Sequence, residues 1–310
     1  MYSTDGRHHV TSSAGTDRRI PSWAAGLLAG LARDLPTVIT REELAGRLAE
    51  AGSARDVEST IAELRRLGWL ASLPLHGAWA FIPPGQDRVV DPYIDLRAWR
   101  AREPTVEFCL AGAAAAWHLA YLDRSTAGRI PLWLPRDLRL PDGLRTLVSV
   151  VRISWPIEHC DQLGPNPAML VRRQLDIVSW ASGLPAFGPE ALVVQLAARP
   201  GSFEPWADLV AHLDALAADC DERRLVTLLG GQSASTWQRA AYLLQAGGQE
   251  QRGLEVLEQR PPRPMPTVRF EGAKRRAGGA DGDSDGGLWV PQYRLVDRLI
   301  APLQGLVGKG

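Results

Sequence analysis

Residues of the types that perform covalent or metal chemistry are scattered in this sequence. His118 lies in an alanine-rich stretch, and His159 stands next to Cys160. A Cys–His pair acts as a nucleophile only when the fold brings the two side chains into hydrogen-bond contact, which spacing alone does not establish. The G-x-S-x-G, H-E-x-x-H and G-x-x-x-x-G-K-[ST] patterns do not occur. Lys274 and Lys309 are the only lysines, so sites that require a lysine have few candidates. The sequence predicts no enzyme and no cofactor.

The potential metal ligands do not form a site either. Each cysteine lies more than 50 positions from the next (Cys109, Cys160, Cys220), which supports neither a zinc knuckle nor a disulfide framework. The run Asp-Gly-Asp-Ser-Asp-Gly at 281–286 resembles the start of a calcium loop. Position 12 of such a loop is a bidentate Glu, and here it is Gln292. We therefore interpret this run as an acidic loop and predict no metal.

Side chains suited to contacting DNA concentrate between residues 18 and 76. Arg pairs with guanine, Ser donates to bases or phosphates, and Asp or Glu accepts from cytosine. With Val57, Ile61 and Leu64 facing inward, the other side of the same helix carries such groups. The predicted DNA-binding residues are Arg18, Arg19, Thr40, Arg41, Ser53, Arg55, Asp56, Ser59, Glu63, Arg66 and His76. We expect Thr40 and Arg41 to hold phosphate at a helix N-terminus, Arg18 and Arg19 to act as an arm, and His76 to lie at a wing tip.

The elements that position these residues follow a recognisable order. A helix is predicted from Ser22 to Leu35, a short strand at 37–39, and a second helix from Thr40 to Gly52, in which Thr40 and Glu43 form a capping box. A third helix is predicted from Ser53 to Gly68, followed by strands at 69–73 and 78–82. Helix, strand, helix, helix and hairpin is the layout of a winged helix-turn-helix.

The remainder of the chain mixes helix and strand signals. Helices are predicted at 108–122, 189–198, 206–218, 235–245 and 295–306, and strands at 130–134, 147–153 and 265–270. The predicted fold class is α+β, with an N-terminal winged helix-turn-helix domain and a larger mixed α/β C-terminal domain. The predicted domains are a flexible tail at 1–19, a DNA-binding domain at 20–85 and the C-terminal domain at 86–310, which contains a mobile loop at 271–287.

Composition limits the class of protein further. The 310 residues are 45% apolar with a net charge of zero, which indicates a folded chain of about two domains. No run of 18 apolar residues occurs and the first 19 residues have no apolar core, so we expect a cytoplasmic location and no membrane partner. Residues 18–85 contain eight Arg and seven Asp or Glu. So small an excess favours binding as a dimer, or on a palindromic site, over tight binding by a monomer.

Three segments carry a resemblance to a known family. They are Thr40-Arg-Glu-Glu-Leu-Ala, Leu64-Arg-Arg-Leu-Gly-Trp-Leu and Gly77-Ala-Trp-Ala-Phe-Ile-Pro-Pro-Gly. With Phe108–Tyr121 and Arg239-Ala-Ala-Tyr-Leu-Leu, they resemble AbiEi, the antitoxin of AbiE-type (type IV) toxin–antitoxin systems, and most of all its mycobacterial MenA-type members. The resemblance implies a winged helix that represses its own operon at inverted repeats in the promoter. It also implies a C-terminal domain that counteracts a nucleotidyltransferase toxin.

Two other interpretations remain open from the residues alone. In the first, the protein neutralises a toxin through protein contacts and its winged helix never binds DNA. In the second, the C-terminal domain contains an enzyme whose acids, Cys or His gather only in the fold. The oligomeric state is also open at this point.

Overall fold

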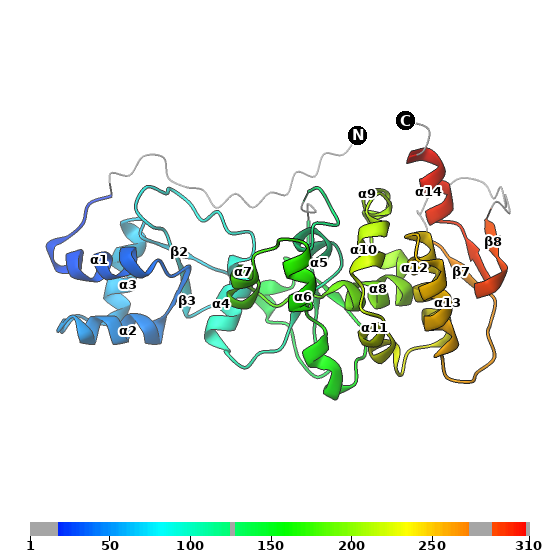
Figure 1. Cartoon of the computed structure of the whole chain (residues 1–310). Helices are drawn as coiled ribbons and strands as arrows, with labels where there is room; N and C mark the ends of the chain where they lie inside the picture. Colours follow the sequence, from blue (N-terminus) through cyan, green and yellow to red (C-terminus); the bar gives the residue numbers. More distant parts are fainter. Residues whose placement is uncertain (1–17, 125–127, 273–286, 308–310) are drawn as a thin grey trace, which may run out of the picture. The chain divides into compact units, whose positions relative to one another are not determined.

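The computed structural model describes residues 18–124, 128–272 and 287–307. They form two compact units (Figure 1). The N-terminal unit runs to Val106 and includes Leu140–Arg145, and the C-terminal unit comprises Glu107–Arg139 and the chain from Thr146 onward. Most of the tail predicted at 1–19 and most of the loop predicted at 271–287 lie outside the described residues.

The N-terminal unit begins with three helices. A short 3-10 turn at Ser22–Ala24 precedes α1 (Ala25–Asp34), which is followed by α2 (Arg41–Glu50) and α3 (Val57–Arg66). The predicted capping box of α2 is confirmed, because the Thr40 hydroxyl accepts from the Glu43 amide at 3.2 Å and the Thr40 amide donates to the Glu43 carboxylate at 2.8 Å. An N-cap of this kind contributes about 1 kcal/mol to stability.

A small antiparallel sheet completes the predicted order. Strands β1 (Val38–Thr40), β2 (Leu70–Ser72) and β3 (Ala78–Phe81) are arranged β1-β3-β2. The turn between β2 and β3 ends at Gly77, whose φ of +82° suits glycine. Helix, strand, helix, helix and hairpin therefore follow one another in the predicted order. The core of this unit includes Leu28, Leu31, Ile39, Leu44, Leu64, Trp69 and Phe81.

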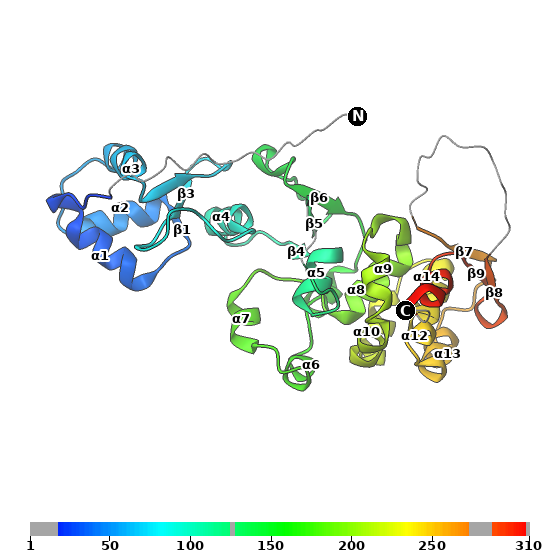
Figure 2. The same ribbon diagram turned by 90° about the horizontal axis from the view of Figure 1, so that it is seen from above.

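Two features of this unit differ from the sequence prediction. The third helix begins at Val57, not near Ser53, because the Asp56 carboxylate caps it by accepting from the Ser59 amide. The compact unit also continues beyond residue 85, where the sequence predicts a boundary, through α4 (Ile94–Arg102). This helix packs on β1 and β3 and buries Trp99 (Figure 2). Arg97, Arg100 and Arg102 interrupt the apolar positions of α4, so the sequence pattern does not reveal its apolar face.

The C-terminal unit is mainly helical, with two three-stranded sheets. Its first part contains β4 (Cys109–Leu110), α5 (Gly112–His118), β5 (Ile130–Trp133), β6 (Val148–Val151), α6 (Pro167–Arg172) and α7 (Ile177–Ser182). Its helical centre contains α8 (Pro189–Ala198), α9 (Trp206–Val210), α10 (Leu213–Asp219), α11 (Glu222–Leu229), α12 (Ala234–Ala246) and α13 (Glu250–Glu258). The last part contains β7 (Val268–Phe270), β8 (Leu288–Val290), β9 (Leu295–Asp297) and α14 (Ile300–Val307). The two sheets are ordered β4-β5-β6 and β7-β9-β8.

Helix α8 is the centre of this unit. Residues 189–197 are all buried, and the helix contacts α5, α10, α11 and α12 (Figure 1). A helix that is apolar on all sides must be surrounded in this way. The prediction of this helix, with Pro189 at its first position, is confirmed.

Three predicted helices have other boundaries. The helix predicted at 206–218 is divided into α9 and α10, and the one predicted at 108–122 starts only at Gly112, after β4. The segment 295–306 begins as strand β9, and only from Ile300 is it helical. Nowhere in the described residues is a helix both long and apolar enough to cross a membrane.

Candidate functional sites

The outward face of α3 is the first candidate site. Ser59, Ala62 and Arg66 lie along it, opposite the buried Ile61 and Leu64, and all three are exposed. Arg65 is the next exposed residue. Within the described part of the chain, the side chains of Arg65 and Arg66 make no hydrogen bond or ion pair. Two uncompensated guanidinium groups therefore face solvent near the end of this helix.

The other arginines of this surface are paired with acids. Arg55 Nη2 lies 2.7 Å from Glu63 Oε2, and its guanidinium carbon stands 3.8 Å from the centre of the Trp23 ring. Arg41 Nε lies 2.9 Å from Glu58 Oε1. Exposed ion pairs of this kind contribute at most about 1 kcal/mol, so a phosphate can displace the acid at low cost.

Asp56, Ser59 and Ser53 serve the local structure of α3. The Asp56 carboxylate accepts from the Ser59 amide at 2.8 Å and from its hydroxyl at 3.0 Å, and these hydrogen bonds hold the pKa of Asp56 below its usual value. The Ser53 hydroxyl accepts from the Arg55 amide at 3.4 Å. The structure shows that the side chains of these predicted contact residues are already engaged in starting the helix.

The remaining predicted contacts lie at the margins of the unit. Thr40 is buried, with its hydroxyl in the capping box. Arg18 is folded onto the unit, where it donates to the carbonyls of Ile82 at 3.4 Å and Pro83 at 3.3 Å and lies beside Gly68, just after α3. Arg19 is exposed, and so is His76 in the turn between β2 and β3.

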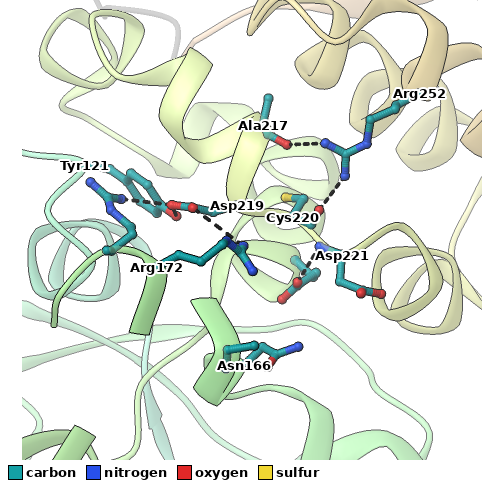
Figure 3. A network of polar contacts seen from close by, with 11 residues as sticks. Tyr121, Asn166, Arg172, Ala217, Asp219, Cys220, Asp221 and Arg252 are labelled. Atoms are coloured by element: carbon teal, nitrogen blue, oxygen red, sulfur yellow. Dashed lines mark hydrogen bonds and ion pairs between the residues drawn. The ribbon is translucent and has the colours of Figure 1, made fainter. Parts of the chain in front are cut away.

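A second candidate is a polar network in the C-terminal unit that converges on Asp219 (Figure 3). The Tyr121 hydroxyl donates to Asp219 at 2.8 Å, and Arg173 donates to the same oxygen at 3.1 Å. Arg172 lies 3.9 Å from the other carboxylate oxygen. Burial, together with the Asp219 charge, raises the pKa of Tyr121 far above its usual value. The network connects the end of α6 and the segment after α5 to the end of α10, and it keeps the tyrosine protonated, so its role is structural.

A third cluster joins α8 to α11. The buried Glu190 carboxylate accepts from the Asp221 amide at 2.7 Å, and Arg224 Nε lies 3.9 Å from its other oxygen. Arg224 also donates to the carbonyls of Gln162 at 2.6 Å and Gly164 at 2.7 Å. Burial raises the pKa of Glu190. Every member of this cluster connects segments of the fold.

The His and Cys residues considered for covalent chemistry are packed separately. The His118 ring lies 4.8 Å from the Trp117 ring and 6.0 Å from the Trp180 ring, measured between centroids. Cys160 is a free thiol whose pKa is raised by partial burial, which disfavours the reactive thiolate. In the parts of the chain that the structure describes, no three His, Cys, Asp or Glu side chains are grouped so that they could hold a metal ion.

Glu190 provides a prediction about pH. Because its pKa is raised above the ordinary 4.5, its contribution to the free energy of unfolding is complete below that pH and declines as the pH rises through the raised value. Glu190→Gln removes this decline. Between pH 4 and 8, urea unfolding of the wild type should lose stability relative to the variant by up to about 1.4 kcal/mol per pH unit. Glu258→Gln on α13, an exposed carboxylate, is the matched control. Parallel curves for wild type and Glu190→Gln would refute the assignment.

The comparisons with known proteins define the class of this protein. The family description "AbiEi antitoxin C-terminal domain" matches residues 108–246, so the C-terminal unit contains an antitoxin domain. The crystal structure of the RV2827C protein from Mycobacterium tuberculosis is 55% identical, has a TM-score of 0.83, and is matched over 95% of this chain and 98% of its own. The chain belongs to the AbiEi antitoxin family, as the sequence resemblance predicts. No curated protein matches it.

Proposed function

We propose that this antitoxin binds double-stranded DNA in its own promoter through α3, represses its own operon, and counteracts a nucleotidyltransferase toxin through its C-terminal unit. The observation that carries the DNA proposal is the exposed face of α3 with the unpaired Arg65 and Arg66. A helix presented by a helix-turn-helix enters the major groove, where arginine recognises guanine and phosphate.

Neighbouring groups support the same orientation. Arg41 stands at the start of α2, where a helix N-terminus favours phosphate. Arg18 lies beside Gly68, shortly after α3, and the carbonyl of the exposed Arg19 accepts from Trp69 Nε1 at 3.5 Å, so both arginines extend the basic surface around that end of the helix. At the other element of the motif, His76 is exposed in the turn between the strands, and Arg102 lies close to Gly77 of that turn.

The charge balance favours binding as a dimer. The pairs Arg41–Glu58 and Arg55–Glu63 leave few free cations on one copy. Two copies on inverted repeats double the number of phosphate contacts without a more basic domain. Because the same ion pairs reduce the positive charge of this surface, they also favour the second candidate function, in which this unit docks on a protein and not on DNA.

An electrophoretic shift assay on the upstream region of the gene tests the DNA proposal. The full chain should retard this fragment in the presence of excess random DNA, and the binding constant should fall steeply as salt increases. No retarded band at micromolar protein and low salt would leave the protein-docking alternative.

The toxin part of the proposal rests on the family. Co-expression of the full chain with the product of the neighbouring gene should restore growth. A variant with Arg65 and Arg66 replaced should restore growth equally well if the C-terminal unit neutralises the toxin. Loss of protection in that variant, when the toxin is expressed from an unrelated promoter, would contradict this division of labour.

A further inference from the structure

A pocket of about 370 Å³ in the C-terminal unit lies apart from the groups described above. Its apolar part is formed by Leu134, Ile153 and Ala198. Its polar part is formed by Arg136, Arg152, Ser154, Arg199, Gly231 and Gln232. Neither the family match nor the proposed DNA binding assigns a role to it.

The charge of this pocket is entirely positive. Three arginines line it and no carboxylate does. Arg136, Arg152 and Arg199 are exposed, and none of them has a side-chain hydrogen bond or ion pair within the described residues. Elsewhere in this unit, Arg173 and Arg224 have acidic or carbonyl partners. Three unpaired guanidinium groups around one cavity repel each other, and an anion between them relieves the repulsion.

The topology explains why the arginines meet. Strands β5 and β6 are parallel, and Trp133 pairs with Val151 at their carboxyl ends. Arg136 follows the end of β5, and Arg152 directly follows β6. Ligands in parallel sheets bind outside the carboxyl ends of the strands, where side chains from neighbouring strands converge. Arg199 is the residue directly after α8, whose residues 189–197 are all buried.

The turn between α11 and α12 supplies a further part of the polar lining. Gly231, with φ of +78°, lies in the turn between α11 and α12, where an added Cβ would meet no atom within 4 Å. Gln232 donates to the Ser154 carbonyl at 2.9 Å, which ties this turn to the segment after β6. This hydrogen bond restrains one part of the pocket lining, which lowers the entropic cost of binding.

We propose that this pocket binds the oligophosphate group of a nucleoside triphosphate. Guanidinium groups form bidentate, charge-assisted hydrogen bonds with phosphate oxygens, and three of them offset most of the negative charge of a triphosphate. A volume of about 370 Å³ lies within the range of small-ligand pockets, and the apolar part supplies a surface for the sugar and base. The proposal is independent of DNA binding by the N-terminal unit.

Isothermal titration of the full chain with ATP, inorganic triphosphate and adenosine tests it. ATP and triphosphate should bind saturably and weaken with salt, and adenosine should not bind. Arg152→Ala and Arg199→Ala should each weaken ATP binding about 10-fold or more. These side chains are exposed, so the variants should fold normally, which circular dichroism checks. Arg223→Ala, an exposed arginine on α11 outside the pocket, is the matched control and should bind ATP as the wild type does.

Three outcomes would overturn the proposal. The first is no saturation by ATP or triphosphate at millimolar concentration. The second is binding that Arg152→Ala and Arg199→Ala leave unchanged. The third is ATP binding that is lost on replacement of Arg65 and Arg66, which would place the nucleotide on the N-terminal unit. Because duplex DNA and ATP are titrated separately, failure here is distinct from failure of the proposed operator binding.

Discussion

Replacing Asp297 by alanine is expected to lower the free energy of unfolding of the C-terminal unit by about 4 kcal/mol. The Asp297 side chain is fully buried at the end of β9. It accepts from the backbone amides of Leu299 at 2.8 Å, Ile300 at 2.9 Å and Ala301 at 2.6 Å, and from the Tyr242 hydroxyl at 2.7 Å. One carboxylate thus starts α14 and satisfies a buried phenol on α12. Alanine leaves all four donors unpaired, at about 1 kcal/mol each.

Chemical unfolding monitored by tryptophan fluorescence measures this effect, and hydrogen exchange of the α14 amides locates it. Asp297→Asn keeps an oxygen that accepts from the amides but presents NH₂ to the remaining donors, so it should lose about half as much. Glu258→Ala on α13 is the surface control and should change stability by less than about 0.5 kcal/mol. An Asp297→Ala variant as stable as this control would show that the four hydrogen bonds contribute nothing net.

The boundaries predicted correctly depend on signals that are local in the sequence. Pro189 marks the first position of α8, and Thr40 with Glu43 marks the start of α2. Each signal works within one helical turn, so no tertiary information is needed. The sequence does not predict strand β9, because the contact that fixes it is not local. Within an apolar run, the sequence alone favours an Asp297 side chain on the solvent face of a helix. Its partner Tyr242 lies 55 positions earlier, so local spacing does not reveal the hydrogen bond.

The outward face of α3 also follows from a local sequence signal. The spacing of Ile61 and Leu64 identifies the outward face of α3, and Arg66 lies on it. The partners of the other arginines could not be predicted, because Arg41 and Glu58 belong to different helices and Arg55 reaches Glu63 across the first turns of α3. Arg65 is not among the predicted contact residues, although the same helical spacing places it next to that face.

The arginine pocket left no pattern in the sequence. Arg136, Arg152 and Arg199 are separated by 16 and 47 positions and come together only through the parallel pairing of β5 with β6 and the packing of α8. The usable signal is Arg152 near the end of the strand predicted at 147–153, which acquires meaning only once the strand direction is known.

The second large effect concerns the operator. Replacing Arg65 and Arg66 together by alanine should weaken specific DNA binding roughly 100-fold, because each phosphate or base contact by arginine is worth about 1–3 kcal/mol. If the lost contacts are to phosphates, the slope of log K against log salt should also become shallower by about one for each contact. Neither side chain has an intramolecular partner within the described residues, so stability should change by less than about 0.5 kcal/mol.

Arg33→Ala is the matched control for this prediction. Arg33 is an arginine of the same unit, at the end of α1, with a side chain 81% exposed and an ion pair to Asp34 at 3.4 Å. It lies on a different helix from the proposed recognition surface, so its replacement should leave both the affinity and the salt slope unchanged. An equal loss per removed charge in Arg33→Ala, which removes one arginine, and in the Arg65/Arg66 variant, which removes two, would mean that net charge alone drives binding, and α3 would then have no special part in it. A selective loss in the Arg65/Arg66 variant assigns operator recognition to α3, because the two variants remove the same kind of charge from different helices.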